Sequence, residues 1–177
     1  MRANVKSVLT LFAICAVVAL MLAVTNLITA PVIAENEEKA FQQSMLEVLP
    51  EGEKFEKVDV SGLDLPSSIT EVYTEAGGGY VFKIVTKGYS KGLVIMCGVD
   101  SDGNVTGTKS ISNSETPSIG GAAIKKIAAL FVGKNIADVD SVELISGATK
   151  TTAAYRAAFK DALAAAQIIG NGGEINE

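Results

Sequence analysis

The sequence predicts an α+β protein in which one N-terminal transmembrane helix is followed by a small antiparallel sheet packed with helices. A long apolar run without charges comes first, short segments typical of strands fill residues 69–111, and segments with helical periodicity come last. The 177 residues suffice for one domain with a core and its appendages. We divide the chain into a cytoplasmic N-terminus and anchor (1–34), a juxtamembrane helix and connector (35–68) and a main domain (69–177).

The N-terminal run has no charged residue between Lys6 and Glu35. A helix of about 20 apolar residues spans a bilayer, so we expect a transmembrane helix over roughly residues 8–30. Basic residues precede the run and acidic residues follow it, which places the N-terminus in the cytoplasm and the main domain on the extracytoplasmic side of the cell membrane. A cleaved signal peptide is the alternative, with Val32-Ile33-Ala34 as a loose cleavage site. The length of the run favours a retained anchor.

The composition excludes several classes of function. The net charge of −5, with acidic residues spread along the chain, argues against a nucleic-acid-binding protein. The absence of histidine rules out catalysis and metal binding by that residue. Cys15 and Cys97 lie in different environments, so we expect them to stay unpaired, and two cysteines alone do not make a metal centre. We therefore predict no catalytic side chain and no metal site, and any redox chemistry requires an organic cofactor.

The first half of the extracytoplasmic part changes from helical to strand periodicity. Residues 35–49 have amphipathic helical spacing, and a proline and a glycine follow them. The polar residues 51–68 are expected to form a connector. Residues 69–75 and 80–86 read as two strands of a hairpin, turned by three consecutive glycines.

The second half adds two strands and two helices. Residues 93–99 are almost continuously apolar, which is typical of a strand buried on both faces. An Asp-Gly-Asn turn separates it from a fourth strand over 105–111. The sequence then predicts a loop over 113–121, a helix over 122–131, a short apolar segment over 142–145, and a last helix over about 150–169 with an apolar stripe.

The motif Ser146-Gly147-Ala148-Thr149 directly precedes this last helix. A threonine in the first turn of a helix lies beside unpaired backbone N–H groups, which together with the helix dipole form a seat for a phosphate. Gly147 and Ala148 leave little bulk in the way of a large ligand. The alternative is an ordinary cap, in which Ser146 or Thr149 only caps the helix.

Two more elements contain closely spaced glycines. The loop Glu115-Thr116-Pro117-Ser118-Ile119-Gly120-Gly121 joins the fourth strand to a helix. Its proline stiffens it and its glycines permit close approach of the backbone, although such loops are often plain turns. Gly88-Tyr89-Ser90-Lys91-Gly92 precedes the third strand.

The order and spacing of these motifs resemble the FMN-binding domain of the G subunit of the Rnf electron-transport complex. The related C subunit of the Na⁺-translocating NADH:quinone reductase carries the same domain, but the short chain favours the Rnf subunit. The resemblance covers nearly the whole chain, including the anchor and its orientation. The family loop usually reads Glu-Thr-Pro-Gly-Leu-Gly, where this chain has Ser118 and Ile119, and Glu143 stands where the family often has aspartate.

This resemblance implies a covalently bound FMN, attached through a phosphoester to Thr149 by a dedicated flavin transferase. Lys150 either partly neutralises the phosphodiester or is a solvated lysine. The aromatic rings available for stacking on the flavin are Tyr89, Tyr155 and Phe159, of which Phe159 belongs to the apolar stripe. The implied cofactor-binding residues are Thr149, Ser146, Gly147, Ala148, Glu115, Thr116, Pro117, Gly120, Tyr89 and Lys150.

The implied function is that of an electron-carrier subunit in a membrane complex that couples ferredoxin:NAD⁺ electron transfer to Na⁺ or H⁺ translocation. An anchor without intramembrane charges does not conduct ions, so translocation falls to multi-span partner subunits. Two alternatives remain: an anchored flavin-carrying domain that serves an extracytoplasmic reductase, and an anchored binding module without flavin.

Overall fold

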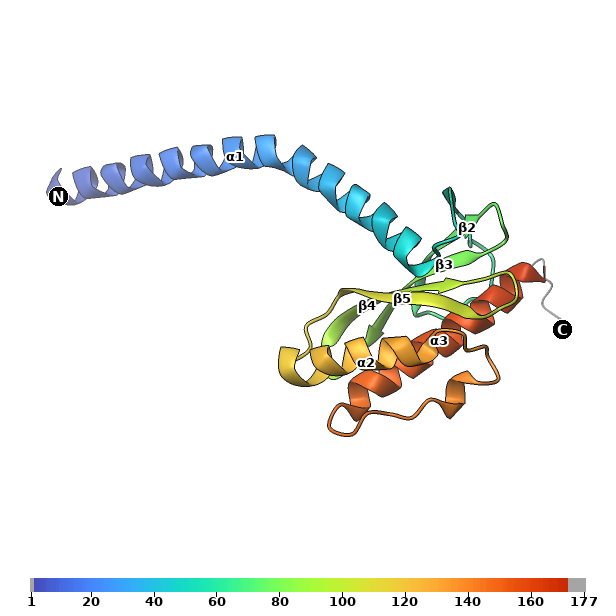
Figure 1. Cartoon of the computed structure of the whole chain (residues 1–177). Coiled ribbons are helices and arrows are strands. Elements are labelled where there is room, and N and C mark those ends of the chain that lie inside the picture. The colour runs from blue at the N-terminus through green and yellow to red at the C-terminus, as the bar shows by residue number, and fades with distance from the viewer. Residues whose placement is uncertain (1, 172–177) are drawn as a thin grey trace. The chain divides into compact units, whose positions relative to one another are not determined.

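The computed structural model describes residues 2–171 and contains two compact units. The first unit ends at Gln42 and the second begins at Gln43, so helix α1 (Arg2–Val48) runs from one into the other. The elements after α1 are β1 (Phe55–Lys57), β2 (Ile69–Glu75), β3 (Tyr80–Lys87), β4 (Lys91–Val99), β5 (Val105–Ser112), the π-helical turn η1 (Pro117–Gly121), α2 (Ala122–Phe131), the 3-10 turn η2 (Val139–Ser141) and α3 (Thr149–Gly170) (Figure 1).

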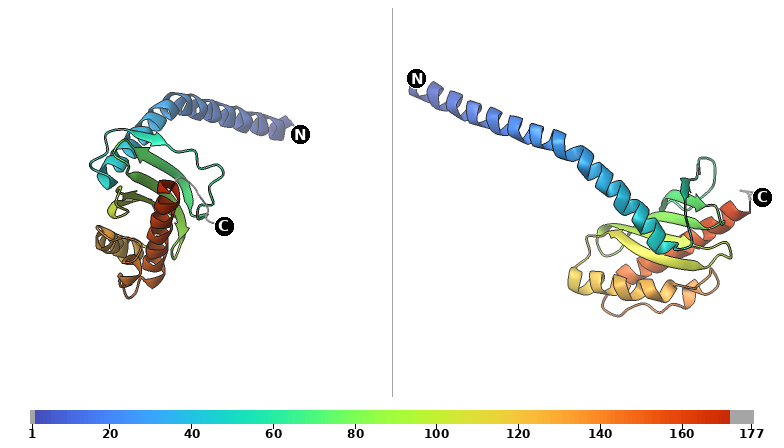
Figure 2. Two further views of the ribbon diagram at one scale, coloured as in Figure 1. Left: turned by 90° about the vertical axis from the view of Figure 1, so that its right-hand side faces the viewer. Right: turned by 45° about the horizontal axis from the view of Figure 1, so that its top comes forward.

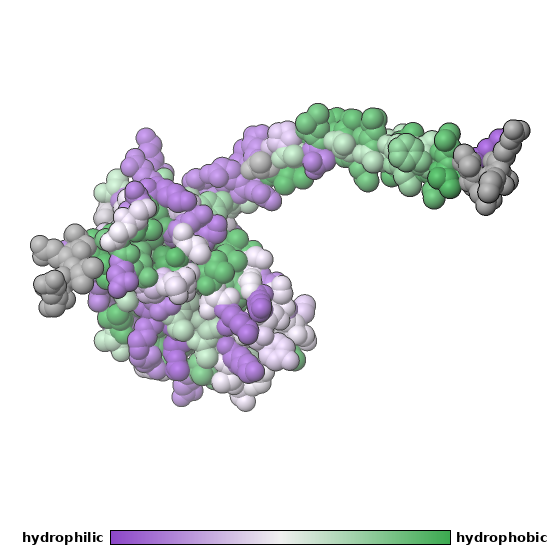
Figure 3. Space-filling model, turned by 180° about the vertical axis from the view of Figure 1, so that it is seen from behind, coloured by the Kyte–Doolittle hydropathy of each residue, from purple (hydrophilic) through white to green (hydrophobic). Residues whose placement is uncertain are grey.

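The first unit is a single helix that exposes an apolar surface. Its large apolar side chains from Val8 to Ile33 are all exposed, and Figure 3 shows this surface as a continuous apolar stretch. The hydroxyls of Thr10, Thr25 and Thr29 each donate to the carbonyl four residues earlier, as a lipid environment requires. Within the described residues this is the one helix long and apolar enough to cross a membrane. It supports the predicted single-pass anchor.

The anchor continues into the predicted juxtamembrane helix without a turn. Pro31 lies inside α1 and does not end it, and residues 2–48 contain no glycine. Local pairs stabilise the polar part, where the Lys39 amine lies 2.7 Å from the Glu35 carboxylate. Residues 35–48 are therefore helical as expected, as the last part of one 47-residue helix.

The second unit contains a five-stranded antiparallel sheet in the order β1-β2-β3-β4-β5, which confirms the predicted sheet. The hairpin of β2 and β3 turns at Gly78, whose φ of 89° favours glycine. Strand β1 falls in the expected connector. Its three residues, Phe-Glu-Lys, include only one apolar side chain and so give no strand signal.

Helices α2 and α3 cover one face of the sheet (Figures 1 and 2). The main core lies between these layers, where the rings of Phe131 and Phe159 stack with centroids 4.3 Å apart. The other large, fully buried side chains of this core include Phe82, Ile84, Leu93, Ile95, Ile127, Tyr155 and Leu163.

The opposite face of the sheet is covered by the last residues of α1, which belong to the second unit. Met45 and Val48 are fully buried, and the Thr106 hydroxyl donates to the Val48 carbonyl at 2.5 Å. Gly107 permits this approach, because a Cβ there would lie 2.7 Å from the Val48 oxygen. Strand β4 is therefore buried on both faces, as its apolar sequence predicts.

Cys15 and Cys97 are both free, which confirms that they do not pair. Burial raises the pKa of the Cys97 thiol, and the thiolate is the form that reacts. We expect Cys97 in a Cys15→Ala variant to resist iodoacetamide in native buffer at pH 8 and to be alkylated after unfolding in urea. Mass spectrometry of the two samples measures this, and rapid native alkylation would contradict the buried position.

Candidate functional site

Three segments that are distant in the sequence meet around a cavity of about 460 Å³. They are the β3–β4 turn, the segment from Glu115 through η1, and the first turn of α3. The volume falls within the range of about 300–1,000 Å³ that is usual for small-molecule sites. The lining residues are Tyr89, Glu115, Thr116, Ile119, Gly120, Gly147, Ala148, Thr149, Lys150 and Thr151.

Most of the candidate residues from the sequence gather here. Of the ten, only Ser146 and Pro117 do not line this cavity: Ser146 lines a second cavity of about 220 Å³, which Lys126 also borders, and Pro117 begins η1. Ile119 and Thr151 line the main cavity, although sequence reasoning did not include them in the site.

The N-terminal end of α3 has no side-chain cap. Ala148 occupies the cap position, so neither Ser146 nor Thr149 caps the helix as the alternative interpretation expected. Thr149 is the first helical residue, it is exposed, and its hydroxyl makes no hydrogen bond within the described part of the chain. The N–H groups of this first turn therefore remain available for an anion, beside a free hydroxyl.

The turn before α3 depends on Gly147. Its φ of 83° is left-handed, and nothing lies within 4 Å of the position that a Cβ would take. A side chain there has space but is conformationally strained. The turn closes with a hydrogen bond from the Ala148 N–H to the Ile145 carbonyl at 3.1 Å.

The buried Thr152 side chain stabilises this turn through hydrogen bonds. Its fully buried hydroxyl accepts a hydrogen bond from the Ile145 N–H at 3.3 Å and lies 3.1 Å from the Ala148 carbonyl, to which it donates. One side chain thus holds both ends of the Ser146–Ala148 segment. Sequence reasoning missed this role, since a threonine inside a helix gives no signal of it.

Removing the Thr152 hydroxyl should loosen the motif. We expect Thr152→Val to lower the free energy of unfolding by about 1 kcal/mol, because the partly buried Ile145 N–H loses its partner. Urea denaturation of the purified protein measures this loss. Thr152→Ser keeps the hydroxyl and should retain most of the stability, and equal losses in the two variants would contradict the role assigned to the hydroxyl.

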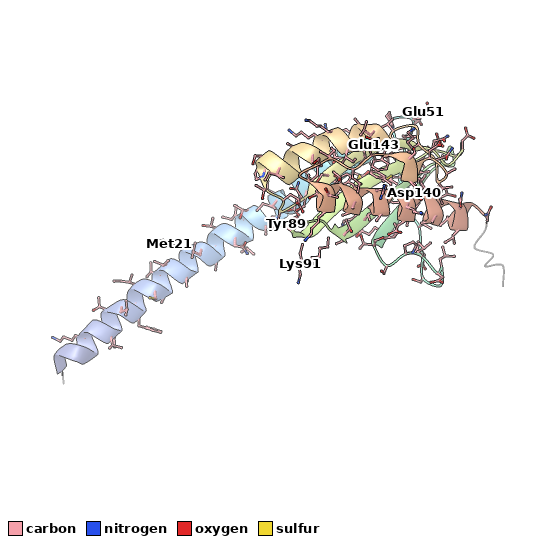
Figure 4. The ribbon with its side chains drawn as sticks, turned by 90° about the horizontal axis from the view of Figure 1, so that it is seen from below. Met21, Glu51, Tyr89, Lys91, Asp140 and Glu143 are labelled. Atoms are coloured by element: carbon pink, nitrogen blue, oxygen red, sulfur yellow. The ribbon has the colours of Figure 1, made fainter. Side chains whose placement is uncertain are left out.

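The segment that leads into the motif is tied to the middle of α3. The Lys160 amine lies 2.6 Å from the Asp140 carboxylate, and this hydrogen bond lowers the pKa of Asp140. The Arg156 guanidinium donates to the Asp140 and Val142 carbonyls, each at 3.5 Å. Figure 4 labels Asp140 and Glu143 along this segment. Glu143 is exposed and free to meet another protein.

Glu115 connects the three segments around the cavity. It is 7% exposed, and its carboxylate accepts hydrogen bonds from the Ser90 N–H at 3.0 Å and from the Thr151 hydroxyl at 2.8 Å. Glycines make room for it, because a Cβ on Gly88 or on Gly120 would lie 2.6 Å from a carboxylate oxygen. These two glycines are needed to seat Glu115 in the wall of the cavity.

The threonines that follow Thr149 are unsuited to attachment of a ligand. Thr151 is 2% exposed, and its hydroxyl donates a hydrogen bond to Glu115. Thr152 is fully buried, and its hydroxyl is hydrogen-bonded to the Ile145 N–H and to the Ala148 carbonyl. Thr149 is the one hydroxyl of this helical turn that combines exposure with a place in the cavity lining.

Tyr89 is the aromatic ring at the rim of the cavity. Its side chain is 69% exposed, and Figure 4 labels it at the β3–β4 turn. The Lys150 amine lies 5.7 Å from the ring centroid, within the range of a cation–π contact. Tyr155 and Phe159 are fully buried against each other in the core and do not line the cavity.

Comparison with known families matches the chain in two parts. Residues 88–164, which include all three segments around the cavity, match the model of the FMN-binding domain. Residues 1–48, which correspond to α1, match the model of the RnfG N-terminal region.

Curated relatives resemble most of the chain. The G subunit of the Na⁺-translocating ferredoxin:NAD⁺ oxidoreductase complex of Acetobacterium woodii is 33% identical over 156 residues, covering 80% of this chain and 74% of the relative. The G subunit of the proton-translocating ferredoxin:NAD⁺ oxidoreductase complex of Clostridium ljungdahlii is 26% identical over 84% of each chain. The G subunit of an ion-translocating oxidoreductase complex of Methanosarcina acetivorans is 27% identical over 89% of this chain and 92% of its own.

Proposed function

Because the chain belongs to the family of G subunits of Rnf complexes, which are ion-translocating ferredoxin:NAD⁺ oxidoreductases, we propose that it holds FMN as a phosphoester of Thr149. It would then act as an electron carrier inside such a complex. The observation that carries the proposal is the free, exposed Thr149 hydroxyl at the uncapped end of α3, in the lining of a cavity of suitable size.

The residues at this site fit a flavin phosphate. The first-turn N–H groups of α3 and the helix dipole favour the phosphate, and Gly147 keeps side-chain bulk away from it. Lys150 adds a positive charge at the same end of the helix, although its exposure limits the benefit. Ser146 and Ala148 complete the turn.

The rest of the cavity suits the ring system. Tyr89 offers an exposed aromatic face, and Thr116 and Gly120 line the cavity from the segment that runs from Glu115 through η1. Pro117 sets the backbone of η1, and Glu115 holds that segment against α3. Bound in this way, FMN supplies one- and two-electron chemistry, and the protein fixes its position and tunes its potential.

Forming the phosphoester requires access to the motif by another protein. The Thr149 oxygen loses its proton and gains a bond to the phosphorus of a flavin nucleotide donor, while the bond from that phosphorus to the donor's leaving group breaks and the proton goes to the leaving group. The chain thereby gains the mass of FMN less one water. A flavin transferase is the partner expected to perform this step. Glu143 and Ser146 are exposed in the segment that leads to Thr149, and they offer such an enzyme a surface.

Ion movement belongs to the partner proteins in this proposal. The single anchor has no charged residue between Lys6 and Glu35, and an uncharged helix provides no path for an ion. One relative is named for Na⁺ and another for protons. We propose that multi-span subunits of the complex select the ion, and that this chain passes electrons on the extracytoplasmic side.

Fluorescence on a denaturing gel tests the attachment. The full chain, purified from cells that carry the transferase, should give a band that fluoresces under ultraviolet light at its own mobility. A band without fluorescence from these cells would favour the flavin-free binding module. Co-purification with multi-span membrane subunits then separates the complex subunit from a domain that serves an extracytoplasmic reductase.

A further inference from the structure

Glu115 is the buried carboxylate in the wall of the candidate flavin cavity. It is 7% exposed, and both of its oxygens accept hydrogen bonds, one from the Ser90 N–H and one from the Thr151 hydroxyl. Both oxygens of this side chain therefore act as hydrogen-bond acceptors. None of the ion pairs within residues 2–171 involves Glu115.

The hydrogen bonds alone do not explain a negative charge at this position. A glutamine could accept from the Ser90 N–H with its carbonyl and donate to the Thr151 oxygen with its amide, so a neutral side chain would also connect the three segments. The hydrogen bonds therefore do not require a negative charge at position 115, and because Glu115 lines the cavity, its carboxylate can act on a ligand bound there.

The positive charge at the cavity, that of Lys150, is exposed to solvent, unlike the buried Glu115. Lys150 lines the same cavity but is exposed, and the phosphate that we place at Thr149 would offset it. Water screens an exposed charge strongly, whereas a buried charge keeps most of its field. Glu115 is thus the charge that dominates the interior of the cavity.

We propose that the Glu115 carboxylate holds the reduction potential of the flavin low, by opposing negative charge on the ring. This inference rests on the proposed function. Negative charge added to a flavin in this cavity would be disfavoured by the nearby carboxylate, which would lower the potential at which the flavin accepts an electron. Glu115 would thereby favour transfer of the electron from the flavin to the next carrier over its retention on the flavin.

The expected effect is large enough to measure. At an effective dielectric constant of about 20, a unit charge about 12 Å away changes such an equilibrium about tenfold, and a closer charge changes it more. We expect Glu115→Gln to favour the reduced flavin by about tenfold or more, which is a rise of about 30 mV for a two-electron couple or about 59 mV for a one-electron step. A spectroelectrochemical titration of the purified, FMN-loaded full chain gives this value.

Two further variants separate charge from structure. Asp102→Asn removes an exposed carboxylate in the β4–β5 turn, outside the cavity lining, and should leave the potential at the wild-type value. Glu115→Asp keeps the charge with a shorter side chain, and its potential should stay much closer to wild type than that of Glu115→Gln. Where Glu115→Gln does not load, Glu115→Ala takes its place as the uncharged variant.

The outcomes distinguish this inference from the proposed function. An uncharged variant that carries the FMN mass but keeps the wild-type potential would overturn the inference and leave the attachment proposal intact. Equal potentials in the charged and uncharged variants at position 115 would overturn it as well. A wild-type chain without the FMN mass would instead overturn the proposed function.

Discussion

Thr149→Ala should abolish covalent FMN completely while leaving the fold intact. The Thr149 side chain is exposed and makes no hydrogen bond within the described residues, so its truncation should change the free energy of unfolding by no more than about 0.5 kcal/mol. The phosphoester, in contrast, has no other exposed hydroxyl to form on in this turn. Fluorescence on a denaturing gel and circular dichroism of the same sample measure the two effects.

Neighbouring hydroxyls supply the controls for this substitution. Thr149→Ser keeps a hydroxyl and shows whether the transferase requires the methyl group. Thr151→Val removes a hydroxyl that is already bonded to Glu115, and this variant should still carry FMN at Thr149. Fluorescence that persists in Thr149→Ala would show that the attachment site is wrong, and Thr151 and Thr152 would be the next residues to test.

The orientation of the anchor should make the second unit accessible to a membrane-impermeant reagent from outside the cell and the N-terminus inaccessible to it. Arg2 and Lys6 precede the apolar run, and Glu35, Glu37 and Glu38 follow it, so the second unit should face the extracytoplasmic space. In a Cys15→Ala background, a cysteine at the exposed Asp102 should react fully with a membrane-impermeant maleimide added to intact cells. The reason is topological, since the reagent reaches only one side.

A cysteine in place of Ala3 is the matched control. It should stay unlabelled in intact cells and react once the cells are lysed. Labelling at position 3 with protection at position 102 would reverse the topology and would contradict an extracytoplasmic flavin. The proposed site in the cavity itself does not depend on this result.

The elements with strong local patterns were predictable from the sequence. Helix α2 occupies residues 122–131 as expected, because its apolar spacing is regular and Gly121 and Gly133 flank it. Strand β4 reads as an unbroken apolar run because α1 residues cover one of its faces and α3 the other. Elements with weak local patterns were missed, among them β1, η1 and η2.

The contacts within the site were not predictable, because they join residues far apart in the chain. Thr151 lies 36 positions from Glu115, and nothing in either local sequence indicates their hydrogen bond. The hydrogen bonds of Thr152 to Ile145 and Ala148 were likewise not indicated by the local sequence. The motifs lie in the loops that meet around the cavity. The fold shows why Thr149, and neither of the following threonines, presents a free hydroxyl.

The most direct test of the central claim is the intact mass of the wild-type protein from its native membrane, followed by peptide mapping. We predict a mass above that of the unmodified chain by FMN less one water, and a modified peptide in which Thr149 carries the addition. An intact mass equal to that of the unmodified chain would contradict covalent attachment, and an addition mapped to any other residue would contradict the site.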